Sequence, residues 1–169
     1  MTLDNVNALP ATDFVAAFGG VFEHSPWVAQ GASTRRPFAS VDAMHEAMMA
    51  AVHAAPESEQ LALLCAHPEL AGREATAGGL TPDSSTEQGR LGFTALAPDE
   101  FRRVAEINRR YRERFGFPCI VALRLHETRA SVIAEMERRT TNARDAEIAA
   151  ALAQVGHITR GRLDKLVSP

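Results

Sequence analysis

A histidine with the properties of a proton donor lies in the segment CAHPELAG, residues 65–72. His67 directly precedes Pro68. A residue before proline disfavours the α conformation, so a helix through Leu63 and Leu64 is expected to end there. The dipole at a helix C-terminus stabilises a protonated imidazole, and histidine titrates near pH ~6.5, which suits acid or base catalysis at neutral pH. The same position also suits a histidine that only ends a helix, and the residues leave both readings open.

A second group of polar side chains follows in SSTEQG, residues 84–89. Ser84 and Glu87 have the spacing of a capping box, in which the two side chains satisfy each other's backbone N–H groups at a helix N-terminus. The functional alternative is that this turn presents Ser84, Glu87 and Gln88 at a helix end, where free N–H groups can bind an anionic or carbonyl-bearing ligand. Glu87 would then orient His67 and stabilise its charged form.

The run FGFPCIVALR, residues 115–124, is the one strand-like stretch of the chain. It is short and has no obvious partner strand, so we expect an extended segment that leads into a helix. It is either a buried apolar segment or a ligand-binding one. In the second case its backbone N–H and C=O groups, left unpaired by any sheet, would bind a planar ligand rich in amide groups.

Two arginines are candidates to hold a carboxylate, because the guanidinium group can bind one through two parallel hydrogen bonds. Arg124 and Arg162 both also fit ordinary surface charge. Arg162 is preferred because it interrupts HITRGRLDKLV, which otherwise has the pattern of a packed helix. Cys65 and His67 stand two positions apart, a spacing that does not bring side chains together on a helix. The other histidines form no HExxH or paired Cys/His pattern, so no metal site is predicted.

Helices are the elements expected to position these residues, since alanine is abundant and alternating β-branched runs are rare. The expected helices cover residues 13–18, 41–55, 58–67, 98–115, 128–142 and 145–167. Thr12 and Ser40 are the expected N-caps of the first two. Pro98 suits the first position of the long helix and Gly116 its C-cap.

Three further expectations concern the segments around these helices. Residues 21–32 are expected to form a short helical turn broken at Pro26, and residues 68–82 a loop with one helical turn. The apolar stripe of the long helix is expected to comprise Phe101, Val104, Ala105, Asn108, Tyr111 and Phe115.

Composition limits the class of protein. A chain of 169 residues fits a single domain, residues 1–169, with a sizeable core. A net charge of −3 provides no basic surface for nucleic acid. No apolar run approaches the roughly 20 residues of a membrane span, and the first residues do not resemble a signal peptide. Two cysteines in apolar surroundings do not form a disulfide framework, which favours a reducing, cytoplasmic location.

Several of these stretches occur, in this order, in a known family. The chain resembles the 2-oxo-4-hydroxy-4-carboxy-5-ureidoimidazoline (OHCU) decarboxylases over nearly its whole length. The motifs that carry the resemblance are AFGGVFEHSPWVA, LLCAHPELAG, STEQGRLGFTAL, FGFPCIVALR and ITRGRLDKLV. No single motif is specific, but AHPELAG followed by STEQ and FGFPCIVALR at these spacings is.

The resemblance implies an all-α domain of about eight helices, a homodimer and a carboxy-lyase that uses no cofactor. The reaction it implies is the loss of CO2 from OHCU to give (S)-allantoin at the end of urate breakdown. His67 corresponds to the family's proton donor, with Glu87 beside it. The implied substrate contacts are Pro68, Ser84, Ser85, Thr86, Glu87, Gln88, Cys119, Ile120, Val121, Ala122, Leu123 and Arg162. Arg160 lies close to Arg162 in the sequence and is the alternative to it. Animal members often end in a peroxisomal signal; this chain ends in LVSP, which favours a cytoplasmic member.

The residues agree with this chemistry. A decarboxylation without a cofactor needs an electron sink, which the conjugated ring of the substrate can supply. The protein must then hold the ring by its amide edge and deliver a proton to one face of the carbanion or enolate. Two alternatives remain: a non-catalytic helical interaction module, and a decarboxylase of a different cyclic ureide.

Overall fold

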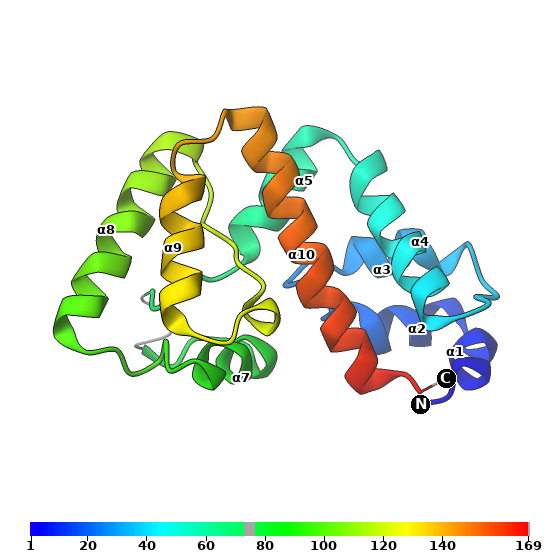
Figure 1. The fold of residues 1–169 in the computed structure, drawn as a ribbon. Coiled ribbons are helices and arrows are strands. Elements are labelled where there is room, and N and C mark those ends of the chain that lie inside the picture. Colours follow the sequence, from blue (N-terminus) through cyan, green and yellow to red (C-terminus); the bar gives the residue numbers. More distant parts are fainter. Residues whose placement is uncertain (73–76, 169) are drawn as a thin grey trace. The chain divides into compact units, whose positions relative to one another are not determined.

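The structure is a computed structural model that describes residues 1–72 and 77–168. The described residues form nine α-helices and one short 3-10 helix (Figure 1). They contain no β-strand, only an isolated bridge between Thr2 and Ser168. The prediction of an all-α chain is therefore confirmed. Within the described ranges, no helix is both long and apolar enough to cross a membrane.

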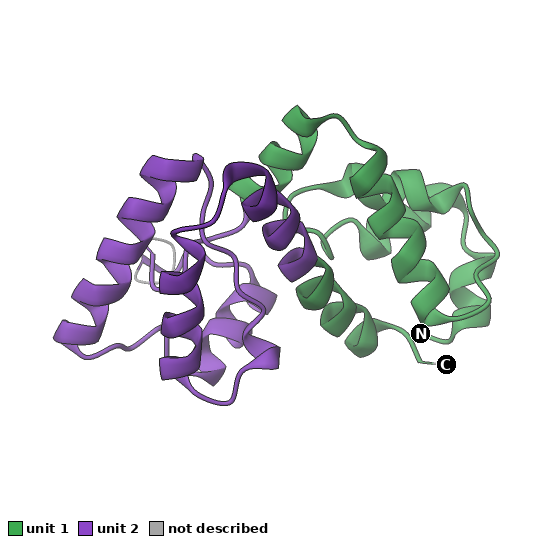
Figure 2. Cartoon of the chain, turned by 45° about the horizontal axis from the view of Figure 1, so that its top comes forward, with its two compact units in different colours: residues 1–66, 156–169 green, residues 67–155 purple. Residues whose placement is uncertain are grey.

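The chain divides into two compact units (Figure 2). Unit 1 comprises Met1–Ala66 and Gly156–Pro169, and unit 2 comprises His67–Val155. The last helix, α10, contributes residues 144–155 to unit 2 and residues 156–166 to unit 1. Each unit is described by itself below.

Unit 1 contains five helices before the C-terminal half of α10. They are α1 (Leu3–Ala8), α2 (Ala11–Phe18), α3 (Pro26–Ser33), α4 (Val41–Ala54) and α5 (Glu57–Ala66). Helix α3 packs against both α2 and α4. The core includes Phe14 and Phe18, whose ring centroids lie 4.9 Å apart, together with Met44 and Met48 of α4. The apolar spacing of α4 explains why this face is buried.

Unit 2 contains α7 (Pro82–Arg90), α8 (Pro98–Phe115), the 3-10 helix η1 (Leu123–Leu125), α9 (Arg129–Arg139) and the first half of α10 (Arg144–Leu166). Helix α8 packs against α9. The Tyr111 ring contacts the rings of Phe115 and Phe117, with centroids 4.7 and 5.8 Å away. Phe117 thus packs the start of the segment that follows α8 against the last turns of that helix.

Several helix ends lie where the sequence predicts them. The Ser40 hydroxyl accepts a hydrogen bond from the Ala43 N–H and caps α4. Pro98 opens α8, and Gly116 ends it with a φ of 84°, in the left-handed region that favours glycine. Helix α5 ends at Ala66, directly before His67.

Other local expectations were wrong. Helix α2 begins one residue before Thr12, with Pro10 as its N-cap and no side-chain cap hydrogen bond. Pro26 is the first residue of α3 and does not break it, because a proline at that position loses no helical hydrogen bond. On α8, Phe101 is 40% exposed, and Ala105 is exposed whereas Ile107 is buried. The predicted loop at 68–82 includes residues 73–76, which lie outside the described residues.

Candidate active site

His67 is a buried residue at the point where α5 ends. It is 4% exposed, and Pro68 after it is half-buried. Cys65 is exposed, so the cysteine and the histidine face different surroundings, as their spacing predicts. A buried imidazole beside a proline turn is sheltered from bulk water, which suits a group that must deliver a proton to a defined carbon atom.

The loop after His67 is held by three polar side chains of α7 and α8. The Gln88 amide accepts a hydrogen bond from the Ala71 N–H at 3.0 Å and donates one to the Glu69 carbonyl at 3.2 Å. Asn108 donates to the Leu70 carbonyl at 2.9 Å, and Arg112 forms an ion pair with the Glu69 carboxylate at 2.8 Å. Ala71 has a φ of 51°, in the left-handed region that alanine rarely adopts. These contacts fix a strained loop at the site.

Helix α7 begins three residues earlier than the predicted capping box. Thr81 is its N-cap and accepts a hydrogen bond from the Ser84 N–H at 3.3 Å, and Pro82 takes the first helical position. The capping-box assignment of Ser84 was therefore wrong. The sequence TPDS contains the correct signal, because a threonine before a proline is a strong helix start.

The residues of the STEQ turn divide between two faces of α7. Ser84 and Gln88 are buried and Glu87 is half-buried, because positions three and four apart share a helix face. Ser85 and Thr86 are exposed. The structure thus brings Ser84, Glu87 and Gln88 to one face and places Ser85 and Thr86 away from it.

The segment 117–122 is neither helix nor strand and leads into the 3-10 helix η1. No strand lies beside it in the described part of the chain. Polar side chains hold two of its backbone groups and the carbonyl of the residue after it. Arg139 donates to the Ile120 carbonyl, and Gln154 accepts from the Ala122 N–H at 2.8 Å. Arg90, the last residue of α7, donates to the Leu123 carbonyl, which ties α7 to η1.

A buried charged cluster lies behind this segment, and the sequence analysis missed it. Arg139 and Glu147 form an ion pair with exposures of 1% and 0%. Tyr111 donates its phenol proton to Glu147, and Asn142 donates to the same carboxylate at 2.7 Å. Arg139 falls on the buried stripe of α9 with Val132, Ile133 and Met136. The sequence signal that could have revealed this cluster is an arginine at a position of the apolar stripe of α9.

Electrostatics keep Tyr111 and Arg139 protonated. Burial raises the pKa of the Tyr111 phenol, and the neighbouring Cys119 and Glu147 raise it further, so the phenol keeps its proton. Burial alone would lower the pKa of Arg139, but Cys119, Glu147 and Tyr111 outweigh it and raise that pKa. Arg139 therefore stays a cation and a hydrogen-bond donor at every ordinary pH.

The C-terminal arginines belong to unit 1. Arg162 is buried and donates to the Glu23 carboxylate at 2.9 Å and to the Val21 carbonyl at 3.2 Å. Arg160 forms surface ion pairs with Asp42 and Asp164. Of these two arginines, Arg162 is therefore the one whose guanidinium group is buried. Arg124 of unit 2 is exposed. Glu23 lies within the motif VFEHSPW, but the sequence analysis did not single it out.

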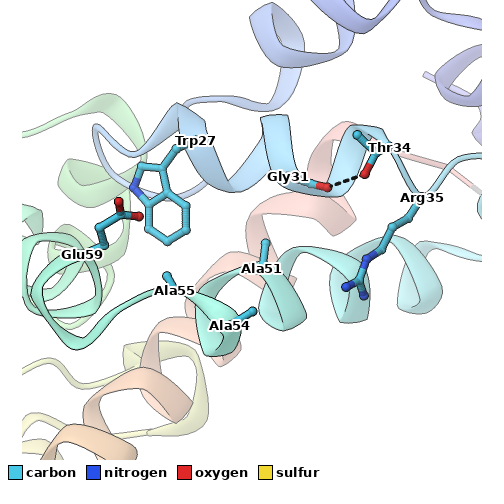
Figure 3. A pocket seen from close by; sticks show the side chains of 8 residues that line it. All are labelled: Trp27, Gly31, Thr34, Arg35, Ala51, Ala54, Ala55 and Glu59. Atoms are coloured by element: carbon cyan, nitrogen blue, oxygen red, sulfur yellow. Dashed lines mark hydrogen bonds between the residues drawn. The ribbon is translucent and has the colours of Figure 1, made fainter.

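Two hollows lie in unit 1, and of the predicted site residues only Arg160, the alternative to Arg162, lines one of them. One, of about 360 Å³, is lined by Trp27, Gly31, Ala51 and their neighbours on α3 and α4 (Figure 3). The other, of about 350 Å³, is lined by residues 39–42 and by Leu3, Arg160, Asp164 and Val167. Within the described ranges, no three His, Cys, Asp or Glu side chains gather as metal ligands would.

Comparison with known proteins shows the family. Residues 7–164 match the model of the OHCU decarboxylases. The chain is 40% identical to the OHCU decarboxylase of Haloferax volcanii, covering 96% of this chain and 94% of that one. It is 37% identical to the OHCU decarboxylase of Mus musculus, covering 99% and 93%. A crystal structure of (S)-allantoin synthase matches with a TM-score of 0.79 and 27% identity, over 99% of this chain and 54% of that one.

The all-helical fold and these matches define the class of protein as a carboxy-lyase. This decides against the alternative of a non-catalytic helical module. The chain belongs to the OHCU decarboxylase family.

Proposed function

We propose that this protein decarboxylates OHCU to (S)-allantoin in urate degradation, without a cofactor and with His67 as the proton donor. The observation that supports the assignment of His67 is the loop that follows it, which side-chain hydrogen bonds hold in place. Gln88, from the STEQ turn, binds both Glu69 and Ala71. Two family motifs that are distant in the sequence are thus joined by hydrogen bonds in one compact unit.

The reaction proceeds by loss of CO2 from the ring carbon that carries the carboxylate. The C–C bond breaks, and its electron pair moves into the conjugated ring of the substrate. His67 then delivers a proton to one face of the resulting carbanion or enolate, which sets the S configuration. Glu87, on the buried face of α7 with Ser84 and Gln88, is assigned the role of orienting the imidazole.

The remaining contacts bind the substrate. Pro68 shapes the wall beside His67, and residues 119–123 offer backbone groups to the amide edge of the ring. Arg162 is assigned to the ring or ureido carbonyls, or to a loose contact with the carboxylate. A tight grip on the departing carboxylate would stabilise the ground state and slow the reaction. The Glu23 carboxylate already offsets the charge of Arg162, which supports a loose contact.

The test is circular dichroism of a urate oxidation mixture that contains urate oxidase and hydroxyisourate hydrolase. OHCU decays slowly to racemic allantoin by itself, so the enzyme is expected to produce a rapid and lasting (S)-allantoin signal. His67→Asn is expected to reduce turnover by about 10²- to 10⁴-fold, the usual contribution of a general acid. His53→Asn, the same change at an exposed histidine of α4, is the matched control.

Three outcomes are distinguishable. No acceleration by the wild-type protein would contradict the substrate and turn the search to other cyclic ureides. Acceleration that survives in a folded His67→Asn variant would contradict the proton donor. Acceleration that yields racemic allantoin would contradict the assignment of protonation to the protein.

We also propose that the protein is a cytoplasmic homodimer, as the family resemblance implies. Size-exclusion chromatography with light scattering tests the dimer. A mass near that of one 18.3 kDa chain across micromolar concentrations would contradict it. Fractionation of the source cells tests the compartment.

A further inference from the structure

Val121 lies in the segment 117–122, and each of the two peptide groups beside it is held by a hydrogen bond with a side chain. Arg139 binds the Ile120 carbonyl, and Gln154 binds the Ala122 N–H. The N–H and C=O of Val121 itself form no hydrogen bond in the described structure, although the residue is buried. Buried backbone groups are almost always paired, so an unpaired donor and acceptor on one residue require an explanation.

The anchors act on the same peptide units that carry these unpaired groups. The Ile120 carbonyl and the Val121 N–H belong to one planar amide, and the Val121 carbonyl and the Ala122 N–H belong to the next. A hydrogen bond to one end of an amide polarises the other end. The Arg139 cation therefore strengthens the Val121 N–H as a donor, and the Gln154 oxygen strengthens the Val121 carbonyl as an acceptor.

The direction of the groups follows from the planar trans amide, in which the N–H and the C=O point in opposite directions. The Val121 N–H therefore points away from Arg139, which binds the carbonyl of the same amide. The Val121 carbonyl likewise points away from Gln154, which binds the N–H of the next amide.

We propose that Arg139 and Gln154 are positioning residues that present the Val121 N–H and C=O as one donor–acceptor pair for the –CO–NH– edge of a cyclic ureide. This inference rests on the proposed function and deepens it, because it names the side chains that position the backbone groups assigned to the ring. The buried Arg139–Glu147 ion pair supports it. Such pairs add little to stability compared with apolar side chains, whereas an arginine held by Glu147 and Tyr111 can aim one N–H at a chosen carbonyl.

The expected change in the kinetic constants distinguishes a role of these residues in substrate binding from a purely structural role. No bond of the ring's amide edge forms or breaks during decarboxylation, so most of the binding energy of its contacts is already present in the ground state. Loss of such a contact raises KM and leaves kcat nearly unchanged. A residue with a purely structural role behaves differently, because partial unfolding reduces the active fraction and lowers kcat at constant KM.

The experiment compares three glutamine variants with the wild type by steady-state kinetics on OHCU and by thermal unfolding. Gln154→Met removes the acceptor for the Ala122 N–H and is expected to raise KM about five- to fiftyfold, the range for a lost hydrogen bond in a binding site. Gln154→Glu keeps an oxygen acceptor and is expected to restore KM to within about threefold of wild type. Gln60→Met is the matched control. Its amide binds only the carbonyls of Val52, His53 and Ala55 at the end of α4, so KM is expected to stay constant.

Arg139→Lys tests the second anchor independently. Lysine keeps the charge beside Glu147 but lacks the fork that reaches both Glu147 and the Ile120 carbonyl, so KM is again expected to rise. An unchanged KM in folded Gln154→Met and Arg139→Lys, with an active wild type, would overturn the inference alone. A fall in kcat at constant KM that follows the loss of folded protein would also overturn it. An inactive wild type would instead contradict the proposed function.

Discussion

Arg162 and Glu23 form a buried ion pair with 2.9 Å between Nη2 and Oε1, and their side chains are 2% and 1% exposed. The two residues stand 139 positions apart in the chain. Arg162 also donates to the Val21 carbonyl at 3.2 Å. Its guanidinium is thus held by the N-terminal motif, which explains why a charged residue is tolerated at a buried position of α10.

Removal of Glu23 is expected to destabilise the protein strongly. Glu23→Ala removes the carboxylate that pairs with the buried Arg162 cation, and loss of one partner of a buried pair costs about 3–5 kcal/mol. Urea denaturation measures this change. Asp42→Asn breaks the surface pair with Arg160 and is the control, with an expected cost of about 1 kcal/mol or less. Equal effects of the two variants would show that the Arg162–Glu23 pair contributes no more than a surface contact.

Loss of the Gln88 amide is expected to affect both stability and turnover. Gln88→Met leaves the Ala71 N–H and the Glu69 carbonyl without the hydrogen bonds that Gln88 makes to them, at a cost of about 2–3 kcal/mol. Release of this loop also displaces His67, so kcat is expected to fall more than about tenfold under conditions where the variant stays folded. Gln88→Glu keeps the acceptor and should have the smaller effect. Wild-type kcat in folded Gln88→Met would separate the loop from catalysis.

His45 is expected to make the stability of the protein depend on pH. Burial lowers the pKa of His45, and the nearby Arg160 cation lowers it further. The unfolded chain therefore takes up this proton at a higher pH than the folded protein does, and the folded state loses stability as the pH falls below about 6.5. His45→Gln should reduce the difference between unfolding free energies measured at about pH 8 and about pH 5.5. The same difference in both proteins would exclude His45 as its source.

The two thiols are expected to react at very different rates. Burial raises the pKa of the Cys119 thiol to about 12, with Glu147 and Glu135 adding to the shift and Arg139 opposing it. Only thiolates are strong nucleophiles, so Cys119 should resist a disulfide reagent until the protein unfolds. Cys65 is exposed and should react quickly. Cys65→Ser is expected to abolish the fast phase, and a fast phase that persists in this variant would contradict the burial of Cys119.

Local patterns account for most of the fold that could be predicted. The Ser40 cap, the proline that opens α8 and the glycine that ends it each depend on the conformational preferences of single residues. The wrong predictions were also local. At Ser84, two overlapping start signals competed, and Thr81 with Pro82 is the stronger pair. At Pro26, a proline that can open a helix was interpreted as one that breaks it.

The candidate site has one part that local sequence patterns predict and another part that they do not. Its motifs and the non-helical segment 117–122 follow from the sequence, because proline, glycine and apolar spacing act over a few residues. The sequence does not show which charged side chains become buried. Arg139 is paired with Glu147 and Arg162 with Glu23, while many other arginines remain on the surface.

The sequence by itself determined the helices, their main boundaries and the family motifs, since these depend on local preferences and periodicity. Only the tertiary structure decided which charged side chains are buried and which backbone groups form hydrogen bonds with distant side chains. The reason is that a buried charge is tolerable only beside a counter-charge, and that partner can come from any part of the chain. Glu23 for Arg162, and Arg139 for the Ile120 carbonyl, were fixed by folding.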